Sequence, residues 1–256
     1  MRRFFIPPDS LQHRPVTLRG AEATHLIHVL RLRSGDTVTL LDGCGKAYHA
    51  EILSCRKQTV TFRIIAPVPA GGESFLRITV AQAFLKVGKM DTSIRQLTEL
   101  GVHRWLPFVS RRSVARPGGP RLATRRRRWH EIAMSAVKQC GRSHVPEITP
   151  LPSLEAVLAA ATESDLKIIF WEKEPVCFAP RVAQTAAGCC RRVFVLIGPE
   201  GGFEEGEVQS ALECGFSGAG LGPRILRAET AAVTACALVQ YVLGDMGPRA
   251  ACAAEE

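Results

Sequence analysis

Hydrophobic and polar positions alternate along the first quarter of the chain. Three runs rich in β-branched residues follow one another, with Gly and Asp turns between them: 35–43, 46–54 and 58–66. Short strands at this spacing are typical of a small barrel or sandwich. The stretch before them, 20–32, is predicted to be helical, because Leu26, Val29 and Leu30 share one face at helical spacing.

The pattern changes after 66–74, a stretch rich in Pro and Gly that has no hydrophobic period and therefore looks like a linker. Beyond it, apolar runs typical of buried strands alternate with stretches of helical spacing. This alternation predicts an α/β domain with a parallel sheet. The expected strands are 75–85, 102–109, 165–173, 191–199 and the short run 218–222.

Helices are expected between and after these strands. One of them is stopped by Gly101, which fits a C′ position. A long helix is predicted from Thr124, as its N-cap, to Ser143. The last helix begins near Glu229 and then carries no charged residue until Asp245. Because it is apolar all round, it must be buried in the core or against another subunit.

The charge of the chain favours an anionic partner. Of its 256 residues, 46% are apolar and 22% charged, as in an ordinary globular protein, but the net charge is +9 and the pI about 9.4. Nucleic acid or an acidic membrane surface would suit this balance, while a solvated surface without a partner explains the charge alone equally well. With no signal-peptide pattern, and with 230–244 too short for a membrane span, we expect a cytoplasmic protein without a membrane partner.

Cysteine and histidine positions give no sign of a metal site. The nine cysteines are scattered and none falls in a CxxC pair, so reduced thiols are expected. His25 and His28 stand three residues apart on the predicted helix, but no third ligand accompanies them. We therefore expect no bound metal.

A glycine-bearing loop follows the strand at 191–199. It reads LIGPEGGFEEGE from Leu196 to Glu207 and is neither a Walker loop nor GxGxxG. Glu200 lies inside the turn, and two more acids fill the first turn of the next helix, where an anion would otherwise bind. A neutral or cationic ligand therefore suits the loop better than a phosphate, although a tight turn without ligand remains the alternative. The helix after it is expected to bury Val208, Ala211 and Leu212.

A second loop, GLGPRILRAETA at Gly220–Ala231, follows the next short strand. It places Arg224, Arg227 and Glu229 just before the uncharged helix. The carboxyl ends of parallel strands lie at one edge of a sheet, so the two loops are expected to meet and form a ligand crevice. Charged residues beside an apolar helix need partners, which points to a binding site or to a structural ion pair.

These two loops resemble those of the RsmE family, the 16S ribosomal RNA uridine N3-methyltransferases of the SPOUT class. Four further stretches appear in the family's order: RRFF at 2–5, HLIHVLRLRSGD at 25–36, TELGV at 98–102 and KQCGRSHVPEI at 138–148. The resemblance implies a PUA-like β-barrel at 1–70, a SPOUT methyltransferase domain with a C-terminal trefoil knot at 71–248, a tail at 249–256, and a homodimer. Gln96 stands where the family commonly has Lys, and Ala228 where it frequently has Thr.

The resemblance also implies S-adenosylmethionine as the methyl donor. This donor carries a sulfonium cation and no phosphate, so the carboxylate of Glu200 is no longer out of place. The residues implied to bind it are Leu196, Ile197, Gly198, Glu200, Gly201, Gly202, Leu221, Gly222, Ile225, Leu226 and Thr230.

The implied substrate is a uridine of 16S ribosomal RNA, either free or in the small ribosomal subunit. Its N3–H is a weak acid, so the enzyme must help to remove the proton or stabilise the negative charge. Arg227 is the first candidate for the second task and Arg224 the next, while Glu229 would orient an arginine or accept the proton. Candidate RNA contacts are Arg2, Arg3, Arg31, Arg125, Arg126 and Arg142.

Two other functions stay open at this point. One is a ribosome-associated RNA-binding factor without catalysis, and the other is a SPOUT methyltransferase that acts on transfer RNA. The run 125–128 is open as well: it fits a face that contacts phosphates, but also the solvated end of a helix.

Overall fold

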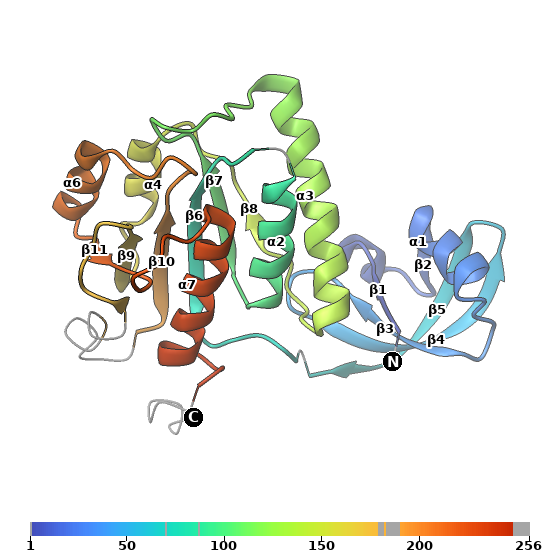
Figure 1. Ribbon diagram of the computed structural model, residues 1–256. Coiled ribbons are helices and arrows are strands. Elements are labelled where there is room, and N and C mark those ends of the chain that lie inside the picture. Colours follow the sequence, from blue (N-terminus) through green and yellow to red (C-terminus); the bar gives the residue numbers. More distant parts are fainter. Residues whose placement is uncertain (1, 70, 87, 179–181, 183–189, 248–256) are drawn as a thin grey trace. The chain divides into compact units, whose positions relative to one another are not determined.

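The computed structural model describes residues 2–69, 71–86, 88–178, 182 and 190–247 (Figure 1). The chain divides into two compact units. We call them the N-terminal unit, Met1–Glu73 with Val137–Val145, and the C-terminal unit, Ser74–Ala136 with Pro146–Glu256. The tail expected at 249–256 lies outside the described residues.

A five-stranded sheet forms the N-terminal unit, with its strands in the order β1-β3-β4-β5-β2. The two edge strands are β1 and β2; β1 runs parallel to β3, and the other neighbours are antiparallel. The strands are β1 (Arg3–Phe5), β2 (Val16–Arg19), β3 (Thr37–Leu41), β4 (Ala47–Arg56) and β5 (Thr59–Val68). The three strands expected from the β-branched runs are confirmed, whereas β1 and β2 are too short to leave a period-two pattern.

The core of this unit follows the alternation of its strands. Val16 and Leu18 of β2 are buried in one cluster with Leu26 and with two alternate residues from each of the next three strands: Val38 and Leu40 of β3, Ala50 and Ile52 of β4, and Val60 and Phe62 of β5. Each fully buried side chain of this kind contributes about 1.5–3 kcal/mol relative to an exposed one. The stretch expected to be one helix is instead the short α1 (Ala21–Thr24) followed by the π-helix η2 (His25–Val29), and a 3-10 helix, η1 (Pro8–Gln12), precedes β2.

Six strands form the sheet of the C-terminal unit, in the order β11-β9-β10-β6-β7-β8, and all neighbours are parallel. The predicted α/β architecture with a parallel sheet is therefore confirmed. The strands are β6 (Arg77–Ala83), β7 (Arg104–Phe108), β8 (Glu147–Ile148), β9 (Leu166–Phe170), β10 (Arg192–Ile197) and β11 (Ser217–Ala219). Central β10 is buried from Val193 to Ile197, because both faces of the sheet are covered.

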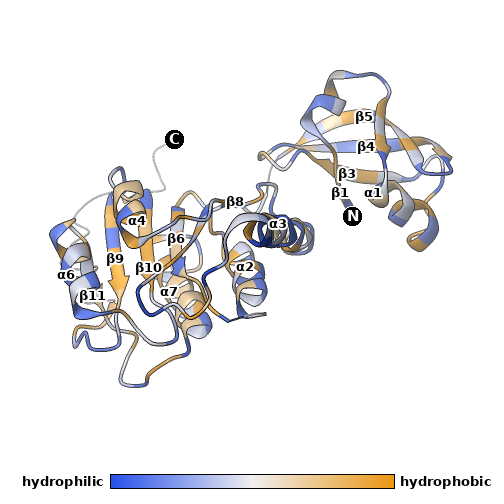
Figure 2. Ribbon diagram, turned by 90° about the horizontal axis from the view of Figure 1, so that it is seen from above, coloured by the Kyte–Doolittle hydropathy of each residue, from blue (hydrophilic) through white to orange (hydrophobic). Residues whose placement is uncertain are grey.

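Helices cover both faces of this sheet (Figure 2). On one face, α2 packs against α7, and α7 packs against β10 and β6. On the other, α4 and α6 share a core cluster with β6, β7, β9 and β10. The helices are α2 (Lys89–Glu99), α3 (Gly119–Cys140), α4 (Leu154–Ala160), α6 (Glu205–Glu213) and α7 (Ala228–Leu243). Within the described part of the chain, no helix combines the length and apolar character that a membrane crossing requires.

Two details of the predicted helices are wrong. Helix α3 begins at Gly119 and not at Thr124, so Thr124 lies inside it and donates its hydroxyl hydrogen to the Pro120 carbonyl at 3.0 Å. Leu212 is 41% exposed, because α6 turns only Val208 and Ala211 toward the core. The predicted end at Gly101 is confirmed, with a φ of +80° just after α2.

Candidate functional site

The loops after four parallel strands meet at one edge of the C-terminal sheet. They follow β6, β9, β10 and β11, whose carboxyl ends lie on the same side because all neighbours are parallel. Together they line a cavity of about 570 Å³. A volume of this size suits a small molecule or cofactor rather than an ion. The sequence-based expectation that the two glycine loops meet in a crevice is confirmed.

The first glycine loop, 198–203, turns sharply after β10. The Gly202 N–H donates to the Pro199 carbonyl at 3.0 Å, and the φ of Gly202 is +69°. A side chain at this position would overlap the carboxylate of Glu172, so only glycine fits the turn. Phe203 then enters the core, where it is 3% exposed and fixes the end of the loop.

Glu204 and Glu207 close the N-terminus of α6 with a capping box. The carboxylate of Glu207 is almost fully buried and accepts hydrogen bonds from the Ser110 hydroxyl at 2.9 Å and from the amides of Arg111 and Glu204, each at 3.0 Å. The helix terminus is thus already satisfied by the protein's own acids. Two carboxylates thus occupy this helix terminus, which disfavours a phosphate there.

The second glycine loop runs beside the segment that follows β9. The Gly220 N–H donates to the Val176 carbonyl at 2.8 Å, and the Phe178 N–H donates back to the Gly220 carbonyl at 3.2 Å. A side chain on Gly220 would meet the Glu174 carbonyl. Glycine therefore allows these two backbone segments to approach each other closely, which brings Trp171 and Glu172 to the cavity wall.

Lys89, the first residue of α2, lies between two carboxylates of the site. Its Nζ is 3.3 Å from Glu200 Oε1 and 3.3 Å from Glu229 Oε2. Glu200 Oε1 also accepts the Lys86 N–H at 3.1 Å. Burial by itself raises the pKa of Glu200, but hydrogen bonds from backbone amides and the nearby Lys89 ammonium outweigh it, so this pKa lies below its ordinary value. Glu200 is therefore ionised at neutral pH.

Two arginines stand on the opposite wall of the cavity. Arg224 and Arg227 both line it and are exposed, and within the described residues neither makes an ion pair. Ile225 between them is 85% exposed, an unusual position for an isoleucine. The interaction expected between Glu229 and an arginine is not what the structure shows, since the partner of Glu229 is Lys89.

Most of the residues predicted to bind a cofactor line this cavity. They are Ile197, Gly198, Glu200, Gly201, Gly202, Leu221, Gly222, Ile225 and Leu226. Leu196 does not: it is fully buried inside β10, where it supports the wall from behind. Thr230 does not line it either, and is exposed on the first turn of α7.

Among the lining residues that sequence reasoning missed, those outside the two glycine loops and α7 are Lys89, Phe170, Trp171 and Glu172. A signal for the last three was available, because they stand at the end of β9, which belongs to the same parallel sheet. The indole Nε1 of Trp171 is buried and finds no acceptor among the described residues. A buried donor without a partner is costly, so it is available to a ligand in the cavity.

The predicted RNA contacts in the N-terminal unit differ in exposure. Arg2 and Arg31 are exposed, and Arg2 Nη1 donates to the Leu30 carbonyl at 2.9 Å. Arg3 is half-buried and donates to the Arg142 carbonyl at 3.4 Å. The guanidinium groups of Arg2 and Arg31 are therefore accessible to solvent, as a contact with a phosphate requires.

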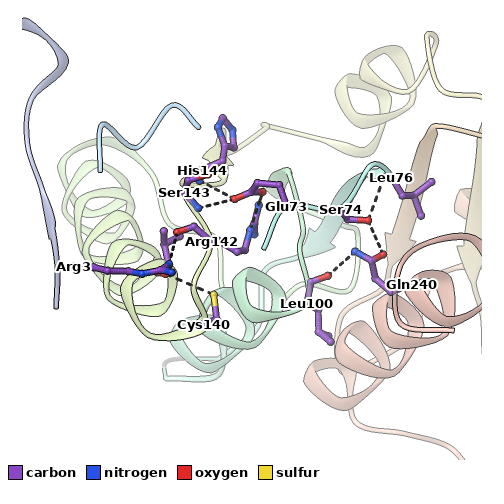
Figure 3. Close-up of polar contacts among 11 residues, drawn as sticks. Arg3, Glu73, Ser74, Leu76, Leu100, Cys140, Arg142, Ser143, His144 and Gln240 are labelled. Atoms are coloured by element: carbon purple, nitrogen blue, oxygen red, sulfur yellow. Dashed lines mark hydrogen bonds and ion pairs between the residues drawn. The ribbon is translucent and has the colours of Figure 1, made fainter. Parts of the chain in front are cut away.

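Arg142 has a different role from the one predicted. Its side chain is 3% exposed and donates from Nε and Nη2 to Glu73 Oε2, at 3.1 and 2.9 Å. The other oxygen of Glu73 accepts the amides of Ser143 and His144, each at 2.9 Å (Figure 3). A guanidinium buried in this pair cannot reach RNA in this conformation, so Arg142 holds the segment in place.

The arginine run on α3 ends in a buried anchor. Trp129 is 1% exposed, stacks on Phe84 and meets Trp105 edge-on, with ring centroids 6.2 and 5.1 Å away. Asp91 accepts hydrogen bonds from both Trp129 Nε1 and Arg128 Nε. The three arginines before them, 125–127, carry no such bond in the described structure, and Arg126 is exposed while Arg125 is half-buried.

Histidine and cysteine side chains form no cluster that could hold a metal among the described residues. His25 and His28 are both exposed on η2. The chemistry of the cavity therefore rests on backbone groups, the carboxylates of Glu172 and Glu200, one lysine and two arginines; Glu229 is a further partner of Lys89 that is not among the lining residues.

Comparison with known domains gives two matches that together cover most of the chain. Residues 72–240 match the model of an RNA methyltransferase domain, and residues 18–65 match that of an RNA methyltransferase PUA domain. The first match contains every residue that lines the cavity.

Curated relatives extend along nearly the full chain. The small-subunit ribosomal RNA methyltransferase E of Bacillus subtilis is 29% identical over 94% of this chain and 96% of its own length. The protein of the same name from Buchnera aphidicola is 30% identical over 92% and 94%. A crystal structure of this methyltransferase from Neisseria gonorrhoeae, bound to S-adenosyl methionine, is 33% identical and covers 96% of this chain and 99% of that one, with a TM-score of 0.86.

Proposed function

Because the chain belongs to the RNA methyltransferase family, we propose that it transfers a methyl group from S-adenosylmethionine to N3 of one uridine in 16S ribosomal RNA. The observation that carries the proposal is the cavity at the carboxyl edge of the sheet, built from the two glycine loops. The resemblance first indicated by those loops is confirmed by the matches to family and relatives.

The residues present fit S-adenosylmethionine. Glu200 and Glu172 offer carboxylates to its positive charge, and the capped helix α6 leaves no phosphate site. The buried indole N–H of Trp171 has no acceptor within the described protein and can donate to a polar group of the ligand. When bound, S-adenosylmethionine supplies an electrophilic methyl group.

The protein's task is then to place the uridine and manage its N3 proton. We assign Arg227 to the negative charge that spreads over the uracil oxygens, with Arg224 as the second candidate. Both line the cavity and have no ion-pair partner among the described residues, so their charges are available. Glu229 is a candidate proton acceptor, held beside Lys89. Alignment of the reacting atoms supplies much of the rate.

Both units offer cations to the RNA. We propose contacts from Arg2, Arg3 and Arg31 in the N-terminal unit and from Arg125 and Arg126 on α3. The match to a PUA domain of RNA methyltransferases and the net charge of +9 support this. The substrate would be 16S ribosomal RNA, free or assembled into the small subunit, which places the reaction in the cytoplasm.

We further propose the SPOUT topology, with a trefoil knot in the domain at 71–248 and a PUA-like barrel at 1–70. The path of the chain supports the knot: after β11 at the sheet edge, the chain returns past the loops that follow β9 and β10 to reach α7. A traced experimental backbone, pulled tight from both ends, would retain the knot if this is right and straighten out if it is not.

A homodimer is proposed as well. Ile225 and Tyr241, which are 85% and 55% exposed, are apolar surface that a second copy would bury. Light scattering should give twice the chain mass of 27.9 kDa. A mass of one chain at micromolar concentration would refute the dimer.

The proposed reaction is tested by reverse transcription across small-subunit RNA from cells with and without the gene. Methylation at N3 blocks the Watson–Crick edge, so a stop at one uridine should vanish in the deletion. A stop that persists shows that the 16S assignment is wrong. Repeating the assay on transfer RNA then tests the alternative substrate.

Calorimetry with S-adenosylmethionine separates the enzyme from a non-catalytic RNA-binding factor. Binding with micromolar affinity is expected, and the absence of any heat would favour the factor. Arg227→Ala gives the second measurement: methylation should slow by about 10²-fold, as for the loss of one charge-stabilising donor. Cofactor affinity should change little.

A further inference from the structure

Three separate parts of the cavity wall converge on a single ammonium group. Lys89 begins α2 at the carboxyl edge of β6, Glu200 lies in the first glycine loop, and Glu229 lies in the first turn of α7. The Lys89 Nζ is 3.3 Å from an oxygen of each carboxylate. Both glycine loops are thus tied to one side chain that neither contains.

The three side chains are well shielded from water. Their exposed fractions are 27% for Lys89, 23% for Glu200 and 19% for Glu229. Ion pairs in such places are screened less than those at the surface, so the pairs hold their parts together more firmly. The Glu229 Oε2 atom is itself buried and has no hydrogen bond in the described structure, so its interaction there is the ion pair with Lys89.

Glycines make up much of both loops, although Phe203 and the hydrogen bonds of Gly202 and Gly220 fix individual points of them. Four of the residues that line the cavity from the first loop are Gly198, Pro199, Gly201 and Gly202, and Gly222 occupies a left-handed conformation in the second. Glycine lowers the cost of the turn but leaves the backbone free to move. A tether from outside the loops therefore has a large effect on how well the pocket is formed before a ligand arrives.

We propose that Lys89 is a positioning residue that clamps the two glycine loops together through Glu200 and Glu229 and thereby pre-forms the cofactor pocket. Lys89 lines the cavity and contacts both loops through these two carboxylates. The inference rests on the proposed function only for the identity of the ligand, because the clamp itself is a property of the free protein.

The clamp is tested with Lys89→Met and a matched control, Lys86→Met. Lys86 stands three residues earlier, is exposed, and contacts Glu200 only through its backbone amide, which methionine retains. Amide hydrogen exchange of the ligand-free proteins should be about tenfold faster in Lys89→Met, in both 198–203 and 220–228, the equivalent of about 1.4 kcal/mol. Lys86→Met should match the wild type.

Calorimetry with two ligands distinguishes a loosened pocket from the mere loss of the positive charge of Lys89. S-adenosylmethionine is a cation at its sulfur, whereas S-adenosylhomocysteine is neutral there. A looser pocket weakens both by a similar factor, about tenfold. Loss of a positive charge alone would instead strengthen the cationic ligand and leave the neutral one unchanged, and that result overturns the clamp. Lys89→Arg should restore both affinities, because a guanidinium can also bridge two carboxylates.

A third variant covers the case in which Lys89→Met unfolds. Glu229→Gln removes one arm and leaves the pair of Lys89 with Glu200, so exchange should rise in 220–228 but not in 198–203. Equal exchange in both loops, or no change in either, refutes the clamp. If the wild type binds neither ligand, the proposed function fails, while the exchange measurements on free protein still decide the clamp.

Discussion

At the scale of single residues, two acids of the stretch 196–207 have different roles. Glu200 lines the cavity, whereas Glu207 is 4% exposed and its carboxylate accepts hydrogen bonds from donors within the protein. The two are seven positions apart and look alike in sequence. Their surroundings separate them: one is exposed to a ligand, the other is surrounded by the backbone after β7 and by the helix that it caps.

Glu207→Ala should destabilise the C-terminal unit strongly. The change leaves the Ser110 hydroxyl and the amides of Arg111 and Glu204 without their acceptor in a buried place. We expect a loss of roughly 2–4 kcal/mol in the free energy of unfolding. Urea unfolding followed by tryptophan fluorescence measures it, since Trp105, Trp129 and Trp171 all belong to this unit.

The control is Glu205→Ala, two positions earlier. Glu205 is 77% exposed and pairs only with Lys173 at the surface. Its removal should leave the free energy of unfolding almost unchanged, because exposed ion pairs contribute little. If both variants unfold at the same urea concentration, the buried network of Glu207 contributes nothing and this account of it is wrong.

The sequence predicted the cavity residues that carry its motifs, and it missed those that depend on topology. Gly198 to Gly202 stand out because their spacing signals a tight turn. Lys89 leaves no such signal: an ion pair with Glu200 depends on two strands, far apart in sequence, being neighbours in the sheet. The spacing of residues along the sequence does not show which strands are neighbours in the sheet. Trp171 was missed for the same reason.

At the scale of elements, long buried strands were predictable and short edge pieces were not. The β10 run is apolar from Val193 to Ile197 and could hardly be anything else. By contrast, β8 has two residues and β11 three, too few to show any period. Helix α3 begins five residues before Thr124, because no capping side chain was needed to start it at Gly119.

The segment between α3 and β8 is held by Glu73, and this gives a prediction about pH. Burial raises the pKa of Glu73, but the Arg142 guanidinium and the amides of Ser143 and His144 outweigh it and hold the pKa below its ordinary value. The folded protein therefore binds this proton less readily than the unfolded chain. The resulting stability is present above about pH 4.3 and is lost as the pH falls through that value and below.

Glu73→Gln should accordingly be less stable than the wild type by about 3 kcal/mol at pH 7, because the buried Arg142 guanidinium loses the carboxylate that faces it. The difference should shrink steadily between pH 5 and pH 3. Urea unfolding followed by circular dichroism at a series of pH values measures it. Glu51→Gln in the same unit is the control, since its partner Arg63 is 65% exposed and the difference should stay small throughout. A Glu73→Gln deficit that does not depend on pH would refute the account.

At the scale of the whole molecule, some surface arginines of the described residues form ion pairs and others do not. Many surface arginines are paired, such as Arg192 with Asp165 and Arg128 with Asp91, whereas 125–127 carry no ion pair in the described structure. Successive side chains of a helix point about 100° apart, so these three arginines cover a broad sector of α3 rather than one face, and a phosphate backbone can neutralise unpaired cations of this kind. The sequence left open whether the run 125–128 contacts RNA or is a solvated helix end. Because Arg128 pairs with Asp91, the candidate RNA contact is reduced to the three residues 125–127.

Replacing Arg125, Arg126 and Arg127 with alanine should weaken RNA binding at least tenfold at 0.1 M salt. The slope of log affinity against log salt should fall by about 2, since each lost phosphate contact removes roughly 0.7–0.9. Fluorescence anisotropy with a labelled 16S fragment measures both quantities. A triple alanine variant of Lys167, Lys173 and Arg192 removes the same charge from positions that have partners in the protein: the Cys214 carbonyl for Lys167, Glu205 for Lys173 and Asp165 for Arg192. If the two variants have the same slope, the run makes no specific contact.

The return of Val137–Val145 to the N-terminal unit has a consequence for synthesis on the ribosome. The first 73 residues emerge together, yet the unit that they form is completed only when residue 145 leaves the exit tunnel. At a synthesis rate of about 5–20 residues per second, Glu73 emerges several seconds before Arg142, its partner in the folded protein. The nascent N-terminal unit must therefore wait for a segment made in the middle of the chain, although all of its residues are present before most of the second unit, which extends to Glu256, has been synthesised.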